Sequence, residues 1–250
     1  MKKWIVLVVA LGWMSMSMAQ SPFEKGNAAY QTEAFEQAIS WYEQALKEPV
    51  ESSEVYFNLA NAHYKLGHVA PSIYYYEKAL LLSPNDETIL SNLHFAQQLQ
   101  IDEVKAENRV GFGKFFYDFA HWISYDAWAK WAIAFSVLGL VLFALYYLSA
   151  KSLYKRIGFT GMFIAFALLI ICTATAYAVQ EQLANENPAV VFARKAEVKA
   201  EPIATASTVF PLHEGTKVWV LDELENFYKI ELADGKSGWI SQDALRLVKE

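Results

Sequence analysis

The stretch YFNLANAHYKLGHVAPSIYYYEKALLLSP, residues 56–84, decides the fold of the amino-terminal part of the chain. It matches the sequence that lies 34 residues earlier, with identities at both ends and in the middle. The matching pairs are Phe23 and Phe57, Asn27 and Asn61, Ala28 and Ala62, Tyr30 and Tyr64, Ile39 and Ile73, Tyr42 and Tyr76, Glu43 and Glu77, Ala45 and Ala79, and Leu46 and Leu80. Unrelated stretches of this length share few identities, so the chain contains an internal repeat.

Small and large side chains alternate within each copy in a way that favours paired antiparallel helices. Gly67 lies where a turn between two helices needs a residue that tolerates positive φ, and Pro84 follows the second helix. We therefore predict an all-α repeat module over residues 20–100, with copies at about 20–52 and 53–86. A third helix from Leu90 to Leu99, within a capping segment 87–100, covers the last apolar face.

These residues resemble the tetratricopeptide repeat family, whose first helices line a concave peptide-binding groove. The resemblance implies that the groove would carry amide, tyrosine and lysine side chains, because asparagine offers both a donor and an acceptor to a peptide backbone. The corresponding residues are Asn27, Tyr30, Asn58, Asn61, Tyr64, Lys65 and Asn92. The alternative for the same residues is a solvated inner face without a ligand.

Composition separates the chain from ordinary soluble domains. Hydrophobic residues make up 54% and charged residues 19%, against about 25% charged in a typical soluble domain. The net charge of −6 argues against a nucleic-acid partner. Residues 1–19 combine Lys2 and Lys3 with a short apolar stretch and end in Ser17-Met18-Ala19, which predicts a signal peptide. An uncleaved anchor is the alternative.

Two charge-free apolar runs, Trp131–Ala150 and Ile157–Gln180, predict membrane-spanning helices over about 127–150 and 157–180. The intervening turn, 151–156, carries Lys151, Lys155 and Arg156 without an acid. Positive charge favours the cytoplasmic side, so we expect a transmembrane hairpin in a bacterial inner membrane. Two spans return the chain to the side it came from. Both folded modules are then expected on the periplasmic side, in agreement with the signal peptide.

The segment 101–126 joins the repeats to the first span and contains aromatic residues at helical spacing. Phe112, Phe115, Phe116, Phe119 and Trp122 recur on one side of this predicted helix. An aromatic helix directly before a membrane span is typical of the headgroup layer. Packing of the same face against the repeat module is the alternative.

Residues 188–250 change to short alternating runs, which predict a small all-β domain. Strands are expected at 217–221, 227–232 and 237–240, with Asp234-Gly235 in a type I′ turn. We expect Gly238 to allow close backbone approach while Trp239 fills the core. The segments EGTKVWVL and FYKIELADGKSGWI resemble the bacterial SH3-like barrel. Its outward side chains would include Trp219, Tyr228 or Trp239, and core packing is the alternative for Trp239.

Catalytic and metal-binding patterns are missing from the sequence. No nucleophile elbow, zinc-protease or P-loop motif occurs. The five histidines are His63, His68, His94, His121 and His213, and no pair has the spacing of a metal-binding helix. The single cysteine, Cys172, falls within the second span and is expected to be a small packing residue. We expect a binding protein rather than an enzyme, without a cofactor or metal.

The order of signal peptide, two tetratricopeptide repeats, two spans and SH3-like domain is similar to the BatE family of the bacterial aerotolerance operon. That resemblance implies a periplasmic adaptor beside von Willebrand A domain membrane proteins and a MoxR-type ATPase system. The sequence leaves two hypotheses open. One is a scaffold that holds protein partners through the groove and the barrel, and the other is a peptidoglycan-binding protein that acts through the barrel.

Overall fold

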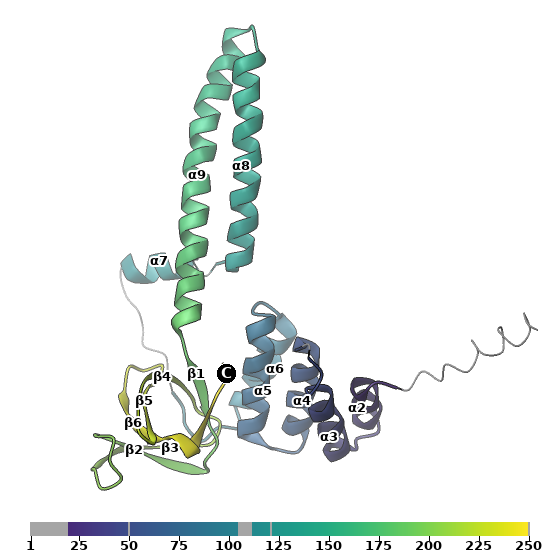
Figure 1. The fold of residues 1–250 in the computed structure, drawn as a ribbon, viewed down its shortest axis with the longest axis vertical. Helices are drawn as coiled ribbons and strands as arrows, with labels where there is room; N and C mark the ends of the chain where they lie inside the picture. The colour runs from purple at the N-terminus through teal and green to yellow at the C-terminus, as the bar shows by residue number, and fades with distance from the viewer. Residues whose placement is uncertain (1–19, 50, 105–111, 121, 250) are drawn as a thin grey trace, which may run out of the picture. The chain divides into compact units, whose positions relative to one another are not determined.

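A computed structural model describes residues 20–49, 51–104, 112–120 and 122–249. The predicted signal peptide, residues 105–111 of the predicted linker and His121 lie outside the described residues. The chain forms two compact units, Met1–Gln100 and Ile101–Glu250. Figure 1 shows short helices in the first unit, and two long helices and a strongly bent sheet in the second.

The first unit is a stack of five described helices, each packed against the next in the chain. The helices are α2 (Pro22–Gln31), α3 (Phe35–Ala45), α4 (Ser53–Lys65), α5 (Val69–Leu82) and α6 (Glu87–Gln97). Ser21 and Glu24 form a capping box at the start of α2, and Asp86 caps α6. The predicted repeat helices and the capping helix are therefore present.

Buried positions repeat at the same offset as the sequence. Tyr42 and Tyr76 are both almost completely buried, as are Ala45 and Ala79. The turns repeat too: Gly67 has a φ of 71°, and Glu33, one repeat earlier, has a φ of 60°. The second copy places glycine where the left-handed backbone conformation is least costly, whereas the first copy tolerates a glutamate there.

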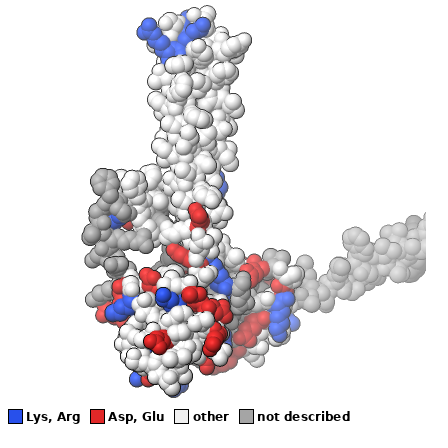
Figure 2. Space-filling model, turned by 60° about the vertical axis from the view of Figure 1, so that its left-hand side comes forward, with Lys and Arg blue, Asp and Glu red and all other residues white. Residues whose placement is uncertain are grey.

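The second unit contains two long apolar helices that pack side by side, α8 (Tyr125–Leu148) and α9 (Ser152–Asn185). Both are long and apolar enough to cross a membrane. Most of their large apolar side chains point outward, and basic residues gather at the tip of the pair in Figure 2. The connecting turn, 149–151, is shorter than the predicted 151–156, because Lys155 and Arg156 lie in the first turns of α9. Both residues have high helix propensity, so α9 begins before its apolar run.

Small residues form the contact between α8 and α9. The buried residues of α9 are Gly158, Ala165, Cys172 and Val179, at a spacing of seven. That spacing keeps one seam of α9 against α8, as in a left-handed helix pair. A Cβ at Gly158 would lie 2.7 Å from the Leu142 carbonyl oxygen, so glycine permits this close approach. Cys172 is buried in the seam among apolar neighbours, in the packing role that the sequence predicted.

Residues 188–247 of the second unit form an antiparallel sheet domain. Its strands are β1 (Pro188–Val191), β2 (Lys195–Lys199), β3 (Thr208–His213), β4 (Lys217–Leu224), β5 (Phe227–Glu231), β6 (Ser237–Ser241) and β7 (Leu245–Leu247). A short 3₁₀ turn, η1 (Gln242–Ala244), precedes β7. The strand order is β3-β2-β6-β5-β4-β1-β7. β3 and β7 end the sheet and do not pair, so the structure has an open seven-stranded sheet where the sequence predicted a barrel.

Strands β4, β5 and β6 lie where the sequence placed them, and the structure decides between the core and the surface position that the sequence left open for Trp239. Gly238 does allow close approach, because a Cβ there would lie 2.5 Å from Val198 Cγ1 and 2.9 Å from the Lys199 carbonyl oxygen. Trp239, however, is only half-buried, and its neighbour Ile240 fills the core. Successive side chains alternate across a strand, so the core position at Ile240 sends Trp239 to the outer face.

The turn between β5 and β6 also differs from the prediction. Among the described residues of this turn, only Gly235 has positive φ, at 80°. The amide of Gly235 donates to the Leu232 carbonyl at 2.9 Å, and the amide of Leu232 donates to the Lys236 carbonyl at 2.9 Å. This is a three-residue loop with glycine in the left-handed position, not a type I′ turn.

Residues 101–104, which follow the repeat module, pack onto the sheet domain. Asp102 accepts hydrogen bonds from the His213 backbone amide at 2.6 Å and from the Thr216 hydroxyl at 2.8 Å. Its other oxygen lies 2.7 Å from His213 Nδ1. Burial raises the pKa of the Asp102 carboxyl, but the hydrogen bonds from His213 and Thr216 outweigh burial and lower the pKa. Val104 packs against the core of the sheet.

Candidate protein-binding site

Four asparagines from three neighbouring helices form the candidate site in the repeat module. Asn27 comes from α2, Asn58 and Asn61 from α4, and Asn92 from α6, and all four are half-buried. We call them the asparagine row. Hydrogen bonds link them in two pairs, Asn27 with Asn58 and Asn61 with Asn92.

Asn27 connects α2 to both of its neighbours. The Tyr42 hydroxyl of α3 donates to Asn27 Oδ1 at 2.8 Å, and Asn58 Nδ2 of α4 donates to the same oxygen at 3.0 Å. Burial raises the pKa of Tyr42 to about 12. The hydroxyl therefore stays protonated at physiological pH, which keeps it a donor.

The same arrangement recurs one repeat later. The Tyr76 hydroxyl of α5 donates to Asn61 Oδ1 at 2.5 Å, and Asn92 Nδ2 of α6 donates to that oxygen at 2.9 Å. Tyr76 is fully buried, and burial raises its pKa well above the usual value. The same tyrosine-to-asparagine hydrogen bond thus explains why both residues recur 34 positions apart, as Asn27 and Asn61 and as Tyr42 and Tyr76.

Part of each amide in the row makes no hydrogen bond to the described residues. For Asn27 and Asn61 this is the donor Nδ2, because their Oδ1 atoms already accept two bonds each. For Asn58 and Asn92 it is the acceptor Oδ1, because their Nδ2 atoms donate within the row. The row therefore offers donors and acceptors along adjacent helices, which is what an extended peptide backbone requires.

The other three predicted groove residues differ in their surroundings. Tyr30 is half-buried and packs edge-on against Phe35, with ring centroids 5.3 Å apart. Tyr64 is half-buried and Lys65 is exposed at the end of α4. Tyr30 thus helps to hold α2 against α3, whereas Tyr64 and Lys65 contribute side chains to the surface.

Sequence reasoning missed two aromatic contacts in this module. Lys25 Nζ lies 4.6 Å from the ring centre of Trp41, a cation–π contact between α2 and α3. His63 is buried, stacks on Tyr75 with centroids 5.5 Å apart, and has its Nδ1 atom 3.1 Å from His68 Nδ1. Burial, and after it the neighbouring His68, lower the pKa of His63 to about 4. The five-residue spacing of His63 and His68 matches no motif from which the contact between the two rings could be predicted.

The sheet domain presents two tryptophans on its outer face. Trp219 pairs with Glu231, and Trp239 pairs with Lys229, on the side of β5 opposite the buried Ile230. Lys217 Nζ lies 5.5 Å from the Trp219 ring centre. Tyr228, the third predicted surface residue, instead packs partly against the core.

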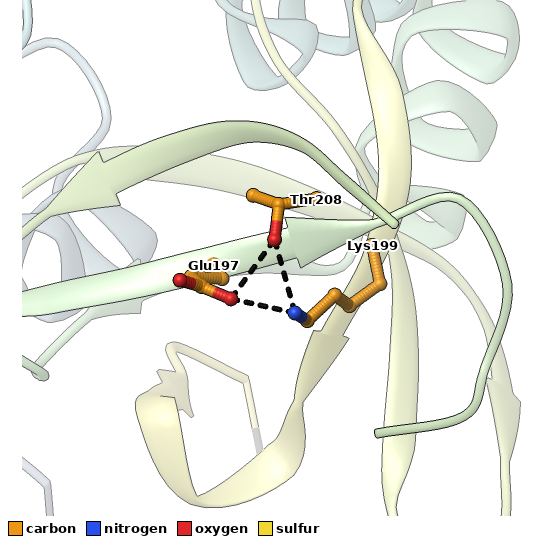
Figure 3. Close-up of polar contacts among 3 residues, drawn as sticks. All are labelled: Glu197, Lys199 and Thr208. Carbon is orange, nitrogen blue, oxygen red and sulfur yellow. Dashed lines mark hydrogen bonds and ion pairs between the residues drawn. The ribbon is translucent and has the colours of Figure 1, made fainter. Parts of the chain in front are cut away.

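Lys199 and Glu197, two of the charged residues near Trp239, form an ion pair with each other. Lys199, which pairs with Trp239, donates from Nζ to Glu197 Oε2 at 2.5 Å and to Thr208 Oγ1 at 3.0 Å. The Thr208 hydroxyl donates to the same glutamate oxygen at 2.9 Å (Figure 3). This triangle spans the irregularity in the β2–β3 pairing and fixes the edge of the outer face.

A cavity of about 710 Å³ adjoins Trp219 in the second unit. Four elements contribute to its lining: α7 (Phe112–Ala120), the end of α9 and the strands β4 and β5. Its charged lining has both signs, with Lys114 and Lys217 beside Asp118, Glu186 and Glu231. Within the described residues, no group of three or more histidine, cysteine, aspartate or glutamate side chains could hold a metal ion.

Comparison with known proteins identifies the repeat module. The tetratricopeptide repeat family matches residues 53–86, and a second family described as TPR repeat matches residues 26–67. Residues 26–86 are tetratricopeptide-like. A search of the curated proteins found no match to the chain. Repeats of this kind are interaction modules, which agrees with the donor and acceptor groups of the asparagine row.

Proposed function

We propose that the protein is a membrane-anchored scaffold that binds an extended segment of a partner protein along the asparagine row. The observation that carries this proposal is the hydrogen-bond pattern of the row, which fixes four amides and leaves one polar end of each available. A role in binding rather than catalysis fits a surface rich in amides. Two repeats and a cap give a short groove, so we expect micromolar affinity.

The proposed location is a bacterial inner membrane, with α8 and α9 as two spans and both folded modules on the periplasmic side. Support comes from Lys151, Lys155 and Arg156 at the tip of the helix pair, with no Asp or Glu from position 127 to 180. Such positive turns remain in the cytoplasm. The SH3-like identity of the sheet domain belongs to the same proposal, supported by the agreement of β4, β5 and β6 with the expected strands.

The proposed partners follow from the resemblance to the BatE family. They are von Willebrand A domain membrane proteins that work with a MoxR-type ATPase system. A partner anchored in the same membrane would meet the row at high local concentration, which compensates for a short groove.

Site-specific crosslinking in cells tests this function. A photocrosslinking amino acid replaces Tyr64 in one variant and the exposed Glu43 of α3 in a matched control. We expect a discrete adduct from position 64 that contains a von Willebrand A domain protein, and its loss when Lys65 is also changed to alanine. Identical adducts from positions 64 and 43, or none from either, would contradict binding along α4.

A second candidate function, attachment to peptidoglycan, is favoured by the two outward tryptophans of the sheet domain. The rings of Trp219 and Trp239 are half-buried, and their outer sides provide stacking surfaces for sugar rings. Glu231 and Lys229 lie beside them as hydrogen-bonding groups. Sedimentation of the detergent-solubilised full chain with purified sacculi tests it. We expect Trp219→Ala with Trp239→Ala to abolish sedimentation and Val209→Ala, an exposed residue of β3, to preserve it. Equal sedimentation of both variants would exclude this face.

A further inference from the structure

Helix α7 carries large aromatic side chains that are exposed to solvent. The side chains of Phe115 and Phe116 are 64% and 61% exposed, and that of Trp122, just after the helix, is 78% exposed. Three large aromatic side chains this exposed form a surface that water solvates poorly. Phe115, Phe116 and Phe119 share one side of the helix, because the first two lie four and three positions before the third. Trp122 follows the helix, which ends at Ala120.

The opposite side of α7 is polar and faces the sheet domain. Lys114, Tyr117 and Asp118 line the cavity that α7 shares with Trp219 and the end of α9. The sheet therefore lies against the charged side of the helix and does not cover the phenylalanines. The polar side of α7 therefore faces the cavity, and the aromatic side faces away from it.

A fixed junction ties α7 to the start of the first long helix. Phe119 packs against Trp128 of α8 with ring centroids 5.1 Å apart, and Trp128 Nε1 donates to the Ala120 carbonyl at 3.0 Å. Trp128 itself is buried. Figure 1 shows α7 lying crosswise beside α9, near the level at which α8 begins. The Phe119–Trp128 contact thus joins the aromatic side of α7 to the apolar helix pair.

We propose that α7 lies in the headgroup layer of the same membrane that α8 and α9 cross, with Phe115, Phe116 and Trp122 inserted among the lipids. Amphipathic helices of this kind bury their apolar face about 5–10 Å into the boundary between headgroups and acyl chains. Lys114 and Asp118 then face water and the cavity. This inference rests on the proposed insertion of α8 and α9, but not on the binding function of the repeat module.

The consequence is that α7 sets the depth at which the helix pair sits. A spanning helix alone can slide and tilt within the bilayer, whereas a second helix held in the headgroup layer fixes its level. The Phe119–Trp128 contact transmits that constraint to α8, and the cavity lining transmits it to the sheet domain.

Fluorescent labelling of the full chain tests the placement. Cys172→Ala removes the only cysteine, and single cysteines then replace Phe116, Asp118 or Val141. Each variant carries an environment-sensitive dye and is reconstituted into phosphatidylethanolamine and phosphatidylglycerol vesicles. One set of vesicles contains a lipid with a quencher near the top of its acyl chain, and iodide serves as a quencher in water. Val141, 59% exposed on α8, reports insertion of the spans.

We expect the dye at position 116 to emit at shorter wavelength and to lose intensity with the lipid quencher, and the dye at 141 to be shielded from iodide. The dye at 118 should respond to iodide instead. Iodide quenching at 116 equal to that at 118 would overturn the proposal. Shielding of 116 from both quenchers would overturn it too, because another protein surface would then cover the face. Failure at 141 would show that the spans themselves do not insert. None of these outcomes depends on the crosslinks formed from Tyr64.

Discussion

At the scale of single residues, one oxygen atom of Asn61 accepts hydrogen bonds from the buried Tyr76 and from Asn92. Asn61→Ala leaves the Tyr76 hydroxyl without its acceptor. We expect it to lower the free energy of unfolding by about 1–3 kcal/mol, the usual cost of an unsatisfied buried polar group. Asn58→Ala removes a donor only, and Tyr42 keeps its bond to Asn27, so its cost should be under about 1 kcal/mol. Hydrogen exchange of α4 to α6 measures both variants, and equal effects would contradict the network.

His63 makes the stability of the repeat module sensitive to acid. Its pKa falls from 6.5 to about 4 because burial disfavours the charged ring. The stability that depends on a neutral His63 is complete above pH 6.5 and is lost as the pH falls towards 4. Between pH 7 and pH 5 we expect a loss of about 2 kcal/mol.

The matched variant is His63→Phe, which keeps an aromatic ring against Tyr75 but cannot be protonated. Hydrogen exchange of α4 should show a smaller acid dependence for His63→Phe than for the natural sequence. Carboxylates titrate alike in both proteins, so the difference isolates His63. The same acid dependence in both would show that His63 is not the titrating group.

The repetition in sequence found the residues of the asparagine row but not their role. Asn27 and Asn61 stood out because they recur, and Asn92 because it follows Asn58 at the same interval. An amide can bind a partner or hold neighbouring helices together, and the residue type is the same in both cases. Only the distances from the Tyr42 and Tyr76 hydroxyls show that Asn27 and Asn61 already accept hydrogen bonds from a neighbouring helix.

At the scale of secondary-structure elements, the contact between α8 and α9 depends on Gly158. A Cβ there would lie 2.7 Å from the Leu142 carbonyl oxygen and 2.8 Å from the Tyr146 amide nitrogen, and backbone atoms cannot rotate away. We expect Gly158→Ala to destabilise the helix pair by about 1–3 kcal/mol, as overpacking does elsewhere. Unfolding in a titration with denaturing detergent, followed by helical circular dichroism, measures the change.

Gly139→Ala of α8 is the control for this prediction. A Cβ at Gly139 would lie 3.9 Å from the Ala165 Cβ, which is an ordinary contact. The variant should therefore unfold as the natural sequence does. Equal destabilisation by the two substitutions would indicate a general loss from replacing glycine and not a steric contact at Gly158.

Helices and strands were predictable from the sequence because their signals are local. The 34-residue repeat placed α2 to α6, hydrophobic length placed α8 and α9, and alternation placed β4, β5 and β6. Sheet closure depends on pairing between β3 and β7, which no local pattern reports. The sequence left Trp239 between the core and the outer face, because its side depends on which of two adjacent residues meets the core, and Ile240 does.

At the scale of the whole molecule, the distribution of charge argues for a protein that crosses a membrane twice. From position 131 to 150 and from 157 to 180 there is no charged residue, whereas the turn between them is basic. The repeat module and the sheet domain carry most of the acidic and basic groups. Two spans would place both folded modules on the same side of the membrane, as the proposed scaffold has them.

Labelling with a membrane-impermeant maleimide tests this claim most directly. In the Cys172→Ala background, single cysteines replace Glu43 in α3, Ser237 in β6 and Lys151 in the turn, all of them exposed. In intact spheroplasts, the account predicts labelling at positions 43 and 237 and none at 151 until the membrane is lysed. Labelling at 151 before lysis, or protection of either 43 or 237, would contradict it.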